Sequence, residues 1–250
     1  MVCWIVYCVQ TTLYTKRVFM KQCFTNATVA WNELEIIRRE SLIREIPILL
    51  NNVWRSLNPA VRFERVETPI LTPASYLQSH INAKFELIEA GKRGFLRPET
   101  TAGTFEAMSM LFPQKESMKK HLPLCLWQVG LSFRDEKNPD TMRASKLRLV
   151  QFYQIEFQLF CSHGTKAPYL EAAANALTDL YCGHLEKPED LPHYSEKTID
   201  WVMDTLEVGG LSKRTDWEHG EVYEVAIGID RLVAKQLQTF YSIQDERRLT

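Results

Sequence analysis

The stretch FRDEKNPDTMRASKLRLVQFYQIEF, residues 133–157, decides the fold and points to the site. It joins two runs rich in aromatic and β-branched residues, 122–133 and 147–160, which predict strands. Charged and aromatic side chains stand at fixed places in it: Arg134, Glu136, Arg148, Phe152 and Glu156. Arginine holds phosphate oxygens with two donors, and a phenylalanine ring stacks on a flat group. The pattern therefore predicts a strand–loop–strand unit that binds a polyanion carrying a ring.

The remaining chain alternates between helical and strand patterns. Apolar residues at helical spacing predict helices over 31–57, 100–112, 167–185 and 230–240. Further strands are predicted over 62–72 and 221–229. Thr100 or Thr101 would cap the second helix, and HLEKPEDLPH (184–193) is a linker-like stretch. Neighbouring strands joined by a loop pair antiparallel, so we expect an α+β fold with helices on one face of an antiparallel sheet.

Composition excludes several classes of protein. The net charge is −1, so a nucleic-acid contact must be a local patch rather than a global basic field. No apolar run approaches the roughly 20 residues that cross a bilayer. Six scattered cysteines fit a reducing compartment such as the cytoplasm. Residues 1–30 are expected to be a strand or irregular lead-in rather than an organelle-targeting helix, because the apolar residues there are β-branched and aromatic. Residues 31–250 are expected to form one domain.

Two local patterns admit a structural or a functional interpretation. Cys161, His163, Cys182 and His184 form two Cys-x-His pairs. Zinc sites usually space paired cysteines by two to four residues, so ordinary packing is favoured over a metal site. Lys115, Lys119 and Lys120, with Arg143, Lys146 and Arg148, form either a solvated face or a local contact for a nucleic acid.

Five segments in the same order resemble the class II aminoacyl-tRNA synthetases, and among them the homodimeric glycyl-tRNA synthetases. ERVETPIL, FRDE…RLVQFYQIE and AIGIDRL look like the three signature motifs of the class. FLRPETTAGTF resembles the family's Arg-Pro-Glu-Thr segment. LPHYSEKTID followed by EVGGLSKRTDW resembles two further stretches of that family. The similarity runs from about residue 64 to 232 and implies a class II synthetase-like antiparallel sheet flanked by helices.

The resemblance implies roles for individual residues on the ATP side. Arg134 would bind the α-phosphate and Arg231 the terminal phosphates, which makes them the catalytic pair. Glu136 would lie near the adenine amino group and Phe152 would stack on the ring. Arg148 and Gly228 are also expected at the nucleotide, and Glu207 is the candidate Mg²⁺ ligand. ATP and Mg²⁺ are therefore the expected cofactors.

On the amino-acid side, the family surrounds the ammonium of glycine with acidic residues. The matching positions are Glu99, Glu156 and Glu224, with Arg214, Phe152 and Ala226 completing the pocket. Glycine offers no side chain to hold, so selection rests on ammonium and carboxylate contacts and on the exclusion of larger molecules. The implied reaction is attack of the glycine carboxylate on the α-phosphorus of ATP, which needs positioning and charge neutralisation more than a protein nucleophile.

The sequence also departs from the family. It ends 19 residues after Arg231, where relatives continue into an anticodon-binding domain, and the insertion after the first motif is short. Ala226 stands in place of a serine, and Gln151 in place of a glutamate. A catalytic core is thus implied, expected as a homodimer because the first motif builds the dimer interface of this class.

Three functions compete at this stage. The first is a ligase that activates glycine and charges the acceptor end of tRNA. The second passes glycyl-adenylate to a non-tRNA acceptor. The third is a non-catalytic interaction subunit. In such a subunit, we expect the residues that bind ATP in the family to be replaced by others. An enzyme is favoured, because the sequence keeps the ATP-binding residues of the family: Arg134, Glu136, Phe152 and Arg231.

Overall fold

A seven-stranded sheet forms the centre of the molecule. The computed structural model describes residues 30–73, 87–135 and 146–246. The strand order is β1-β5-β6-β10-β9-β8-β7. The strands are β1 (Arg62–Arg65), β5 (Leu124–Phe133), β6 (Gln151–Cys161), β7 (His184–Glu186), β8 (Ser195–Met203), β9 (Leu206–Arg214) and β10 (Glu221–Gly228). All neighbouring pairs are antiparallel except β1, which runs parallel to β5.

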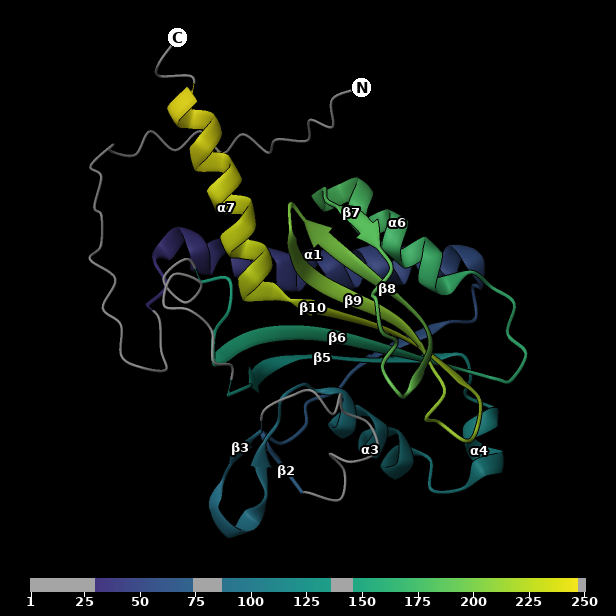
Figure 1. Cartoon of the computed structure of the whole chain (residues 1–250). Coiled ribbons are helices and arrows are strands. Elements are labelled where there is room, and N and C mark those ends of the chain that lie inside the picture. Colours follow the sequence, from purple (N-terminus) through teal and green to yellow (C-terminus); the bar gives the residue numbers. More distant parts are fainter. Residues whose placement is uncertain (1–29, 74–86, 136–145, 247–250) are drawn as a thin grey trace.

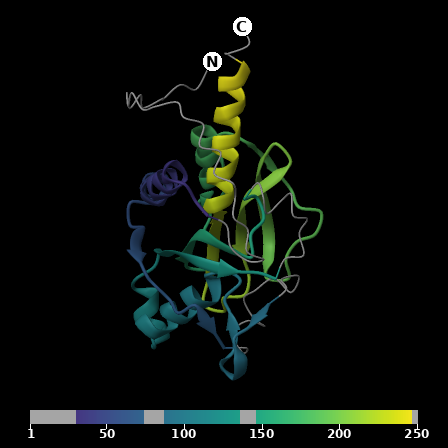
Figure 2. The same cartoon turned by 90° about the vertical axis from the view of Figure 1, so that its left-hand side faces the viewer.

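Helices cover both faces of this sheet, as Figures 1 and 2 show. The helices are α1 (Glu33–Leu57), α3 (Thr101–Leu111), α4 (Lys115–Lys119), α6 (Tyr169–Tyr181), α7 (Ile229–Glu246) and the short 3₁₀ turn η1 (Gly91–Arg93). α1, α6 and α7 lie on one face, and α3 and α4 lie on the other (Figure 1). The predicted α+β sheet flanked by helices is confirmed, but the expectation of helices on one face alone is wrong.

The second covered face follows from the strand sequences. Leu124, Leu126 and Phe160 point to the α3 side, where they pack with Phe105 and Met108 of that helix. The alternate residues of the same strands point to α1 and α6. Strands that bury apolar residues on both faces need a cover on each of them.

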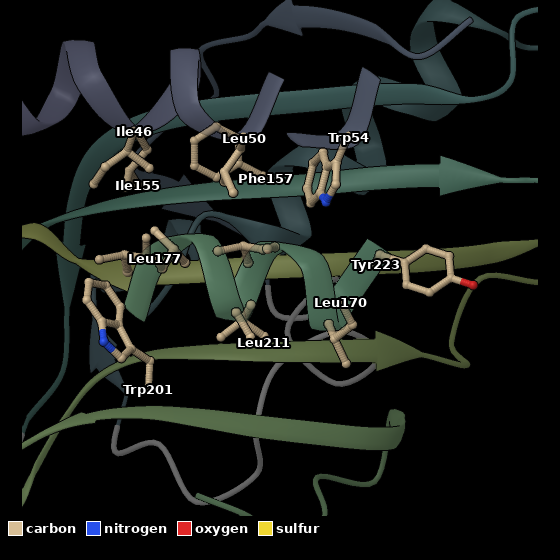
Figure 3. Close-up of a cluster of buried hydrophobic side chains, with 14 of the residues drawn as sticks. Ile46, Leu50, Trp54, Ile155, Phe157, Leu170, Leu177, Trp201, Leu211 and Tyr223 are labelled. Carbon is tan, nitrogen blue, oxygen red and sulfur yellow. The ribbon is translucent and has the colours of Figure 1, made fainter. Parts of the chain in front are cut away.

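The main core lies between the sheet and the pair α1 and α6. Figure 3 shows Leu50 and Trp54 of α1 against Phe157 of β6, with Leu177 of α6 and Trp201 of β8 alongside. Trp54 is fully buried, and its indole Nε1–H donates to the Tyr169 carbonyl oxygen at 3.0 Å. The polar atom of this large side chain is therefore satisfied inside the core.

Several predicted elements change their limits. The strand expected over 62–72 divides into β1 and β2 (Leu71–Thr72), and β2 pairs with β4 (Phe95–Leu96), which also pairs with β3 (Ile88–Glu89), in a separate three-stranded sheet. The helix expected over 167–185 ends at Tyr181, because Cys182 adopts φ 68°, which a helix cannot continue. The linker-like stretch 184–193 begins with strand β7.

Strands β8 and β9 were not identified from the strand pattern. Both mix charged residues with apolar ones, and β9 carries Gly209 and Gly210, which are weak strand formers. Residues 1–29 of the predicted lead-in lie outside the described residues. No helix in the described ranges is long and apolar enough to cross a membrane.

Candidate active site

Three glutamates converge on the α3 face of the sheet. Glu99 precedes α3, Glu156 lies in the middle of β6, and Glu224 lies on β10. Glu156 is fully buried, and the other two are buried almost as deeply. Thr101 connects two of them, because its Oγ1 lies 2.9 Å from Glu156 Oε2 and 3.0 Å from Glu224 Oε2. The structure thus brings together the three carboxylates that the family resemblance grouped.

Polar neighbours orient these carboxylates. Gln158 Nε2 donates to Glu224 Oε2 at 3.1 Å and to Glu156 Oε2 at 3.3 Å. Thr100 Oγ1 donates to Glu156 Oε2 at 2.7 Å. Of the two predicted capping residues, Thr100 occupies the N-cap position of α3, but its side chain makes no cap bond, and the hydroxyls of both threonines bind carboxylates instead. All these hydrogen bonds to Glu156 reach its Oε2, and its Oε1 has no hydrogen-bond partner among the described residues.

Four buried acceptor oxygens in this region lack a hydrogen-bond partner among the described residues. They are Glu99 Oε1, Glu156 Oε1, Gln154 Oε1 and Gln158 Oε1. A buried acceptor without a partner costs about 1–3 kcal/mol, and more when it is charged. Such atoms are rare in native proteins, and a catalytic or binding role is one of the reasons for which they are kept. The site is short of donors and suits a small molecule that brings several.

The electrostatics agree with that reading. Burial raises the pKa of the Glu99 carboxyl well above its usual range, and the charges of Glu156 and Glu224 raise it further. Burial and the charge of Glu224 also raise the pKa of Glu156, although the hydrogen bonds from Thr100 and Thr101 act in the opposite direction. Clustered carboxylates of this kind favour a bound cation.

Arg214 lies in the same cluster, and its guanidinium binds carboxylates of this chain. Its side chain has no exposed area, and its Nη1 lies 3.0 Å from Glu224 Oε2. Nη2 lies 2.7 Å from Asp216 Oδ2, and Nε lies 3.0 Å from Oδ1 of the same residue. The guanidinium carbon lies 3.8 Å from the centre of the Tyr194 ring. Burial alone would lower the pKa of Arg214, but Glu224 and Asp216 raise it more, so the arginine stays charged.

Arg134 connects the carboxylates to the predicted ATP side. Its guanidinium lies 5.2 Å from the centre of the Phe152 ring, a cation–π distance. Nη2 lies 3.8 Å from Glu99 Oε2, and Nε donates to the Pro98 carbonyl oxygen at 3.0 Å. Phe152 and Glu156 lie on one face of β6, four residues apart. Arg148 is half-buried just before that strand, and Glu136 lies outside the described residues.

Arg231 lies in the first turn of α7 and links two segments. Its Nε donates to the Leu147 carbonyl oxygen at 3.0 Å, and its Nη1 donates to the carbonyl oxygen of Glu207. A Cβ atom added at Gly228 would lie no closer than 3.6 Å to its neighbours, so packing alone does not demand glycine there. Glycine at this place leaves room for a ligand next to the backbone.

Asp200 was not singled out from the sequence. Burial raises its pKa to about 6, and the charges of Glu207 and Glu186 contribute to the shift. Asp200 on β8 pairs with Gly210 on β9, and Glu207 Oε1 would lie 3.8 Å from a Cβ atom at Gly210. The charges of Asp200 and Glu207 therefore interact across adjacent strands, and the main chain of Glu207 binds Arg231. Their spacing along two adjacent strands becomes visible only after β8 and β9 are paired.

Other metal patterns gain no support from the structure. In the described ranges, no group of three or more His, Cys, Asp and Glu side chains is arranged to hold a metal ion. Cys161 is buried in the main core, whereas Cys182 is exposed. Of the surface lysines, Lys119 pairs with Glu116 at 3.1 Å.

Comparison with known proteins relates the chain to two kinds of synthetase. It is 28% identical to the glycine–tRNA ligase of Ureaplasma parvum over 201 residues, which is 72% of this chain and 41% of that protein. It is 34% identical to the glycine–tRNA ligase of Macrococcus caseolyticus over 140 residues, which is 50% of this chain and 29% of that protein. The chain thus spans less than half the length of these curated relatives. No protein-family model matches it.

Among solved structures, the pyrrolysyl-tRNA synthetase from Desulfitobacterium hafniense superposes with a TM-score of 0.55 at 15% identity. The match covers 82% of this chain and 75% of that chain. The fold is therefore that of a class II aminoacyl-tRNA synthetase, and the sequence is homologous to part of the glycine–tRNA ligases.

Proposed function

We propose that this chain is a catalytic core that activates glycine with ATP as glycyl-adenylate and transfers the glycyl group to tRNA. The observation that carries the proposal is the pair of buried carboxylate oxygens, Glu99 Oε1 and Glu156 Oε1, that lack partners within the described ranges. An ammonium group brings three N–H donors, which could bind these two oxygens, and one positive charge, which would offset the clustered carboxylates. The homology to glycine–tRNA ligases supports glycine as the carrier of that ammonium.

The arrangement around the carboxylates favours a very small amino acid. Thr101 and Gln158 tie Glu156 to Glu224, and Arg214 holds Glu224 from the other side. A side chain larger than hydrogen would have to displace groups that are hydrogen-bonded to one another. Larger amino acids should therefore bind much more weakly than glycine, because a small rigid site excludes a larger molecule more easily than it excludes a smaller one.

The adenylation step needs little chemistry from the protein. A glycine carboxylate oxygen forms a bond to the α-phosphorus of ATP, and the bond from that phosphorus to the bridging oxygen of the β-phosphate breaks to release pyrophosphate. The carboxylate is already ionised at pH 7, so no general base is needed. Arg134, between Phe152 and Glu99, is suited to neutralise charge that develops on the α-phosphate. Arg231 would hold the terminal phosphates.

The residues present fit Mg²⁺. This ion is usually bound by one or two carboxylates together with substrate phosphates, which is what Glu207 and Asp200 beside Arg231 can provide. When bound, Mg²⁺ neutralises charge on the terminal phosphates. The protein's own part is to place the two carboxylates next to the phosphate-binding arginine.

A homodimer is part of the proposal. α1 exposes Ile37 and Ile48, whose relative accessibilities are 54% and 61%, and Leu34 on the same helix is also exposed. Exposed apolar residues on one helix favour burial against a partner. A cytoplasmic location, expected from the scattered cysteines, and tRNA as the acceptor complete the proposal.

The test is amino-acid-dependent exchange of pyrophosphate into ATP, measured with all twenty amino acids. We expect exchange with glycine alone, abolished by Arg134→Ala and retained by the control Lys119→Ala, since Lys119 is half exposed and pairs with the exposed Glu116. Charging of tRNA with labelled glycine then tests the acceptor. Exchange without charging would indicate a non-tRNA acceptor. If the folded protein shows no exchange with any amino acid, the proposed ligase activity is wrong, and the hypothesis of a non-catalytic interaction subunit remains.

A further inference from the structure

Asp230 joins three elements on the face of the sheet opposite the carboxylate cluster. It lies in the first turn of α7 and is only 2% exposed. Its Oδ1 lies 3.2 Å from Arg39 Nη1 of α1. Its Oδ2 accepts the backbone N–H of Tyr153 on β6 at 2.8 Å. Each carboxylate oxygen therefore binds a different part of the molecule.

The end of a strand explains why a carboxylate is needed there. The ladder between β6 and β10 ends at the pair Gly228–Gln154, one residue before Tyr153 is reached. The chain turns into α7 at Ile229, so no β10 carbonyl oxygen is left for the Tyr153 amide. The Asp230 side chain replaces that carbonyl, since a buried N–H needs an acceptor.

Arg39 compensates the charge of Asp230 and also packs on the strand. Its guanidinium carbon lies 4.6 Å from the centre of the Tyr153 ring and 5.4 Å from that of Trp31. These residues line a cavity of about 160 Å³ behind the sheet, together with Leu131, Leu149 and Gln151. A planar cation between two rings and one carboxylate has little freedom to move.

Tyr153 and Asp230, which are hydrogen-bonded to each other, each lie next to a residue of the proposed ATP site. Tyr153 follows Phe152, which packs under Arg134, and Asp230 precedes Arg231. We propose that Asp230 is a positioning residue, which fixes the distance between Phe152 and Arg231 and thereby the binding of ATP. Arg39 supports it from α1. The inference rests on the proposed function, in which Phe152 and Arg231 contact opposite ends of ATP. A displacement of about 1 Å in such groups can cost roughly 100-fold in rate.

The experiment separates ATP from glycine. Exchange kinetics of Asp230→Ala should show the KM for ATP raised about tenfold or more, with the KM for glycine within about twofold of the wild-type value. Asp230→Asn keeps an acceptor for the Tyr153 amide and should recover most of the loss. Asp204→Ala is the matched control, because Asp204 pairs with Lys235 of the same helix at 2.8 Å but is exposed. Equal increases in both KM values, or none, would overturn the inference.

A second variant and a second readout guard against misfolding and against failure of the exchange assay. Arg39→Gln removes only the charge on the α1 side and should raise the KM for ATP severalfold if Asp230→Ala does not fold. ATP affinity of each variant is also measured directly by calorimetry. If the wild type binds ATP without exchange, the proposed function fails, and weaker ATP binding by Asp230→Ala still supports the inference. ATP binding equal to wild type overturns it, and a wild type that binds no ATP overturns both.

Discussion

Arg214 Nη1 lies 3.1 Å from Oε1 and 3.0 Å from Oε2 of Glu224, so one donor nitrogen reaches both oxygens of a buried carboxylate. The same guanidinium binds Asp216 through two other nitrogens. One cation thus serves two carboxylates and fixes the direction in which Glu224 faces the rest of the cluster. Arg214, expected from the family resemblance to contact glycine, has a clear structural role in holding Glu224.

Arg214→Gln should destabilise the protein strongly, because it leaves the buried Glu224 and the partly buried Asp216 without their cation. Breaking a buried ion pair on one side typically costs about 3–5 kcal/mol. Urea unfolding at pH 7.5 measures the loss. Lys119→Gln, which removes the cation of an exposed pair with Glu116, should change the unfolding free energy by less than about 1 kcal/mol. Equal effects of the two substitutions would contradict the assigned role.

Glu99→Gln should abolish activity but make the protein more stable by about 0.5–2 kcal/mol at pH 8, as relief of a functional strain often does. Burial and the charges of Glu156 and Glu224 raise the pKa of Glu99 above its ordinary value of 4.5. The folded state therefore holds a proton that the unfolded state releases. The stability from this group is fully present below about pH 4.5 and is lost as the pH rises through the folded pKa.

The stabilisation by Glu99→Gln should accordingly grow between pH 5 and pH 8. Unfolding free energies of the variant and the wild type, taken across this range, give the difference directly. Glu116→Gln, at an exposed position, should change the unfolding free energy by no more than about 0.5 kcal/mol. A Glu99→Gln protein less stable than wild type at pH 8 would show that the carboxylate is not under repulsion.

Sequence patterns predicted the parts of this molecule that depend on local chemistry. β5, β6 and β10 are rich in β-branched and aromatic residues, and the apolar spacing of 31–57 is that of a helix, which the structure shows as α1. The three glutamates and Arg214 were grouped through family motifs, whereas Thr101 and Gln158, which bind the glutamates, were not. Whether the Thr100 hydroxyl binds its own helix or Glu156 depends on how α3 lies against β6, which no local pattern records. Gln158, Asp216 and Asp200 acquire meaning only from the pairing of distant strands.

Gly130→Ala should disrupt the attachment of the Arg-Pro-Glu-Thr segment to the sheet. A Cβ atom at Gly130 would lie 2.0 Å from Arg97 Nη2. Arg97 is buried, and it donates to the Leu131 and Thr68 carbonyl oxygens at 2.8 and 2.7 Å. Displacing it would combine overpacking with lost hydrogen bonds, for a total of about 3 kcal/mol or more.

Gly210→Ala is the matched control for this substitution. The nearest atom to a Cβ there is Glu207 Oε1 at 3.8 Å, which is an ordinary contact, so its effect on stability should stay below about 1 kcal/mol. Chemical unfolding of both variants measures the difference. If Gly130→Ala unfolds with the wild-type midpoint, the Arg97 side chain must have another place to go, and the close packing at Gly130 would lose its significance.

Ala226→Ser should improve the use of glycine, because it restores the hydroxyl that the glycyl-tRNA synthetase family carries at this place. Ala226 pairs with Glu156 on β6 and with Gly210 on β9, so the new oxygen would stand beside the open part of the carboxylate cluster. One net hydrogen bond is worth about 1 kcal/mol, which is roughly a fivefold lower KM for glycine. The KM for ATP should not change. Ala226→Cys adds similar bulk with only a weak donor and should leave the KM for glycine near the wild-type value. Equal KM values in the serine and cysteine variants would show that the hydroxyl makes no contact with glycine, and a higher KM in both would show that the position cannot accept a larger side chain.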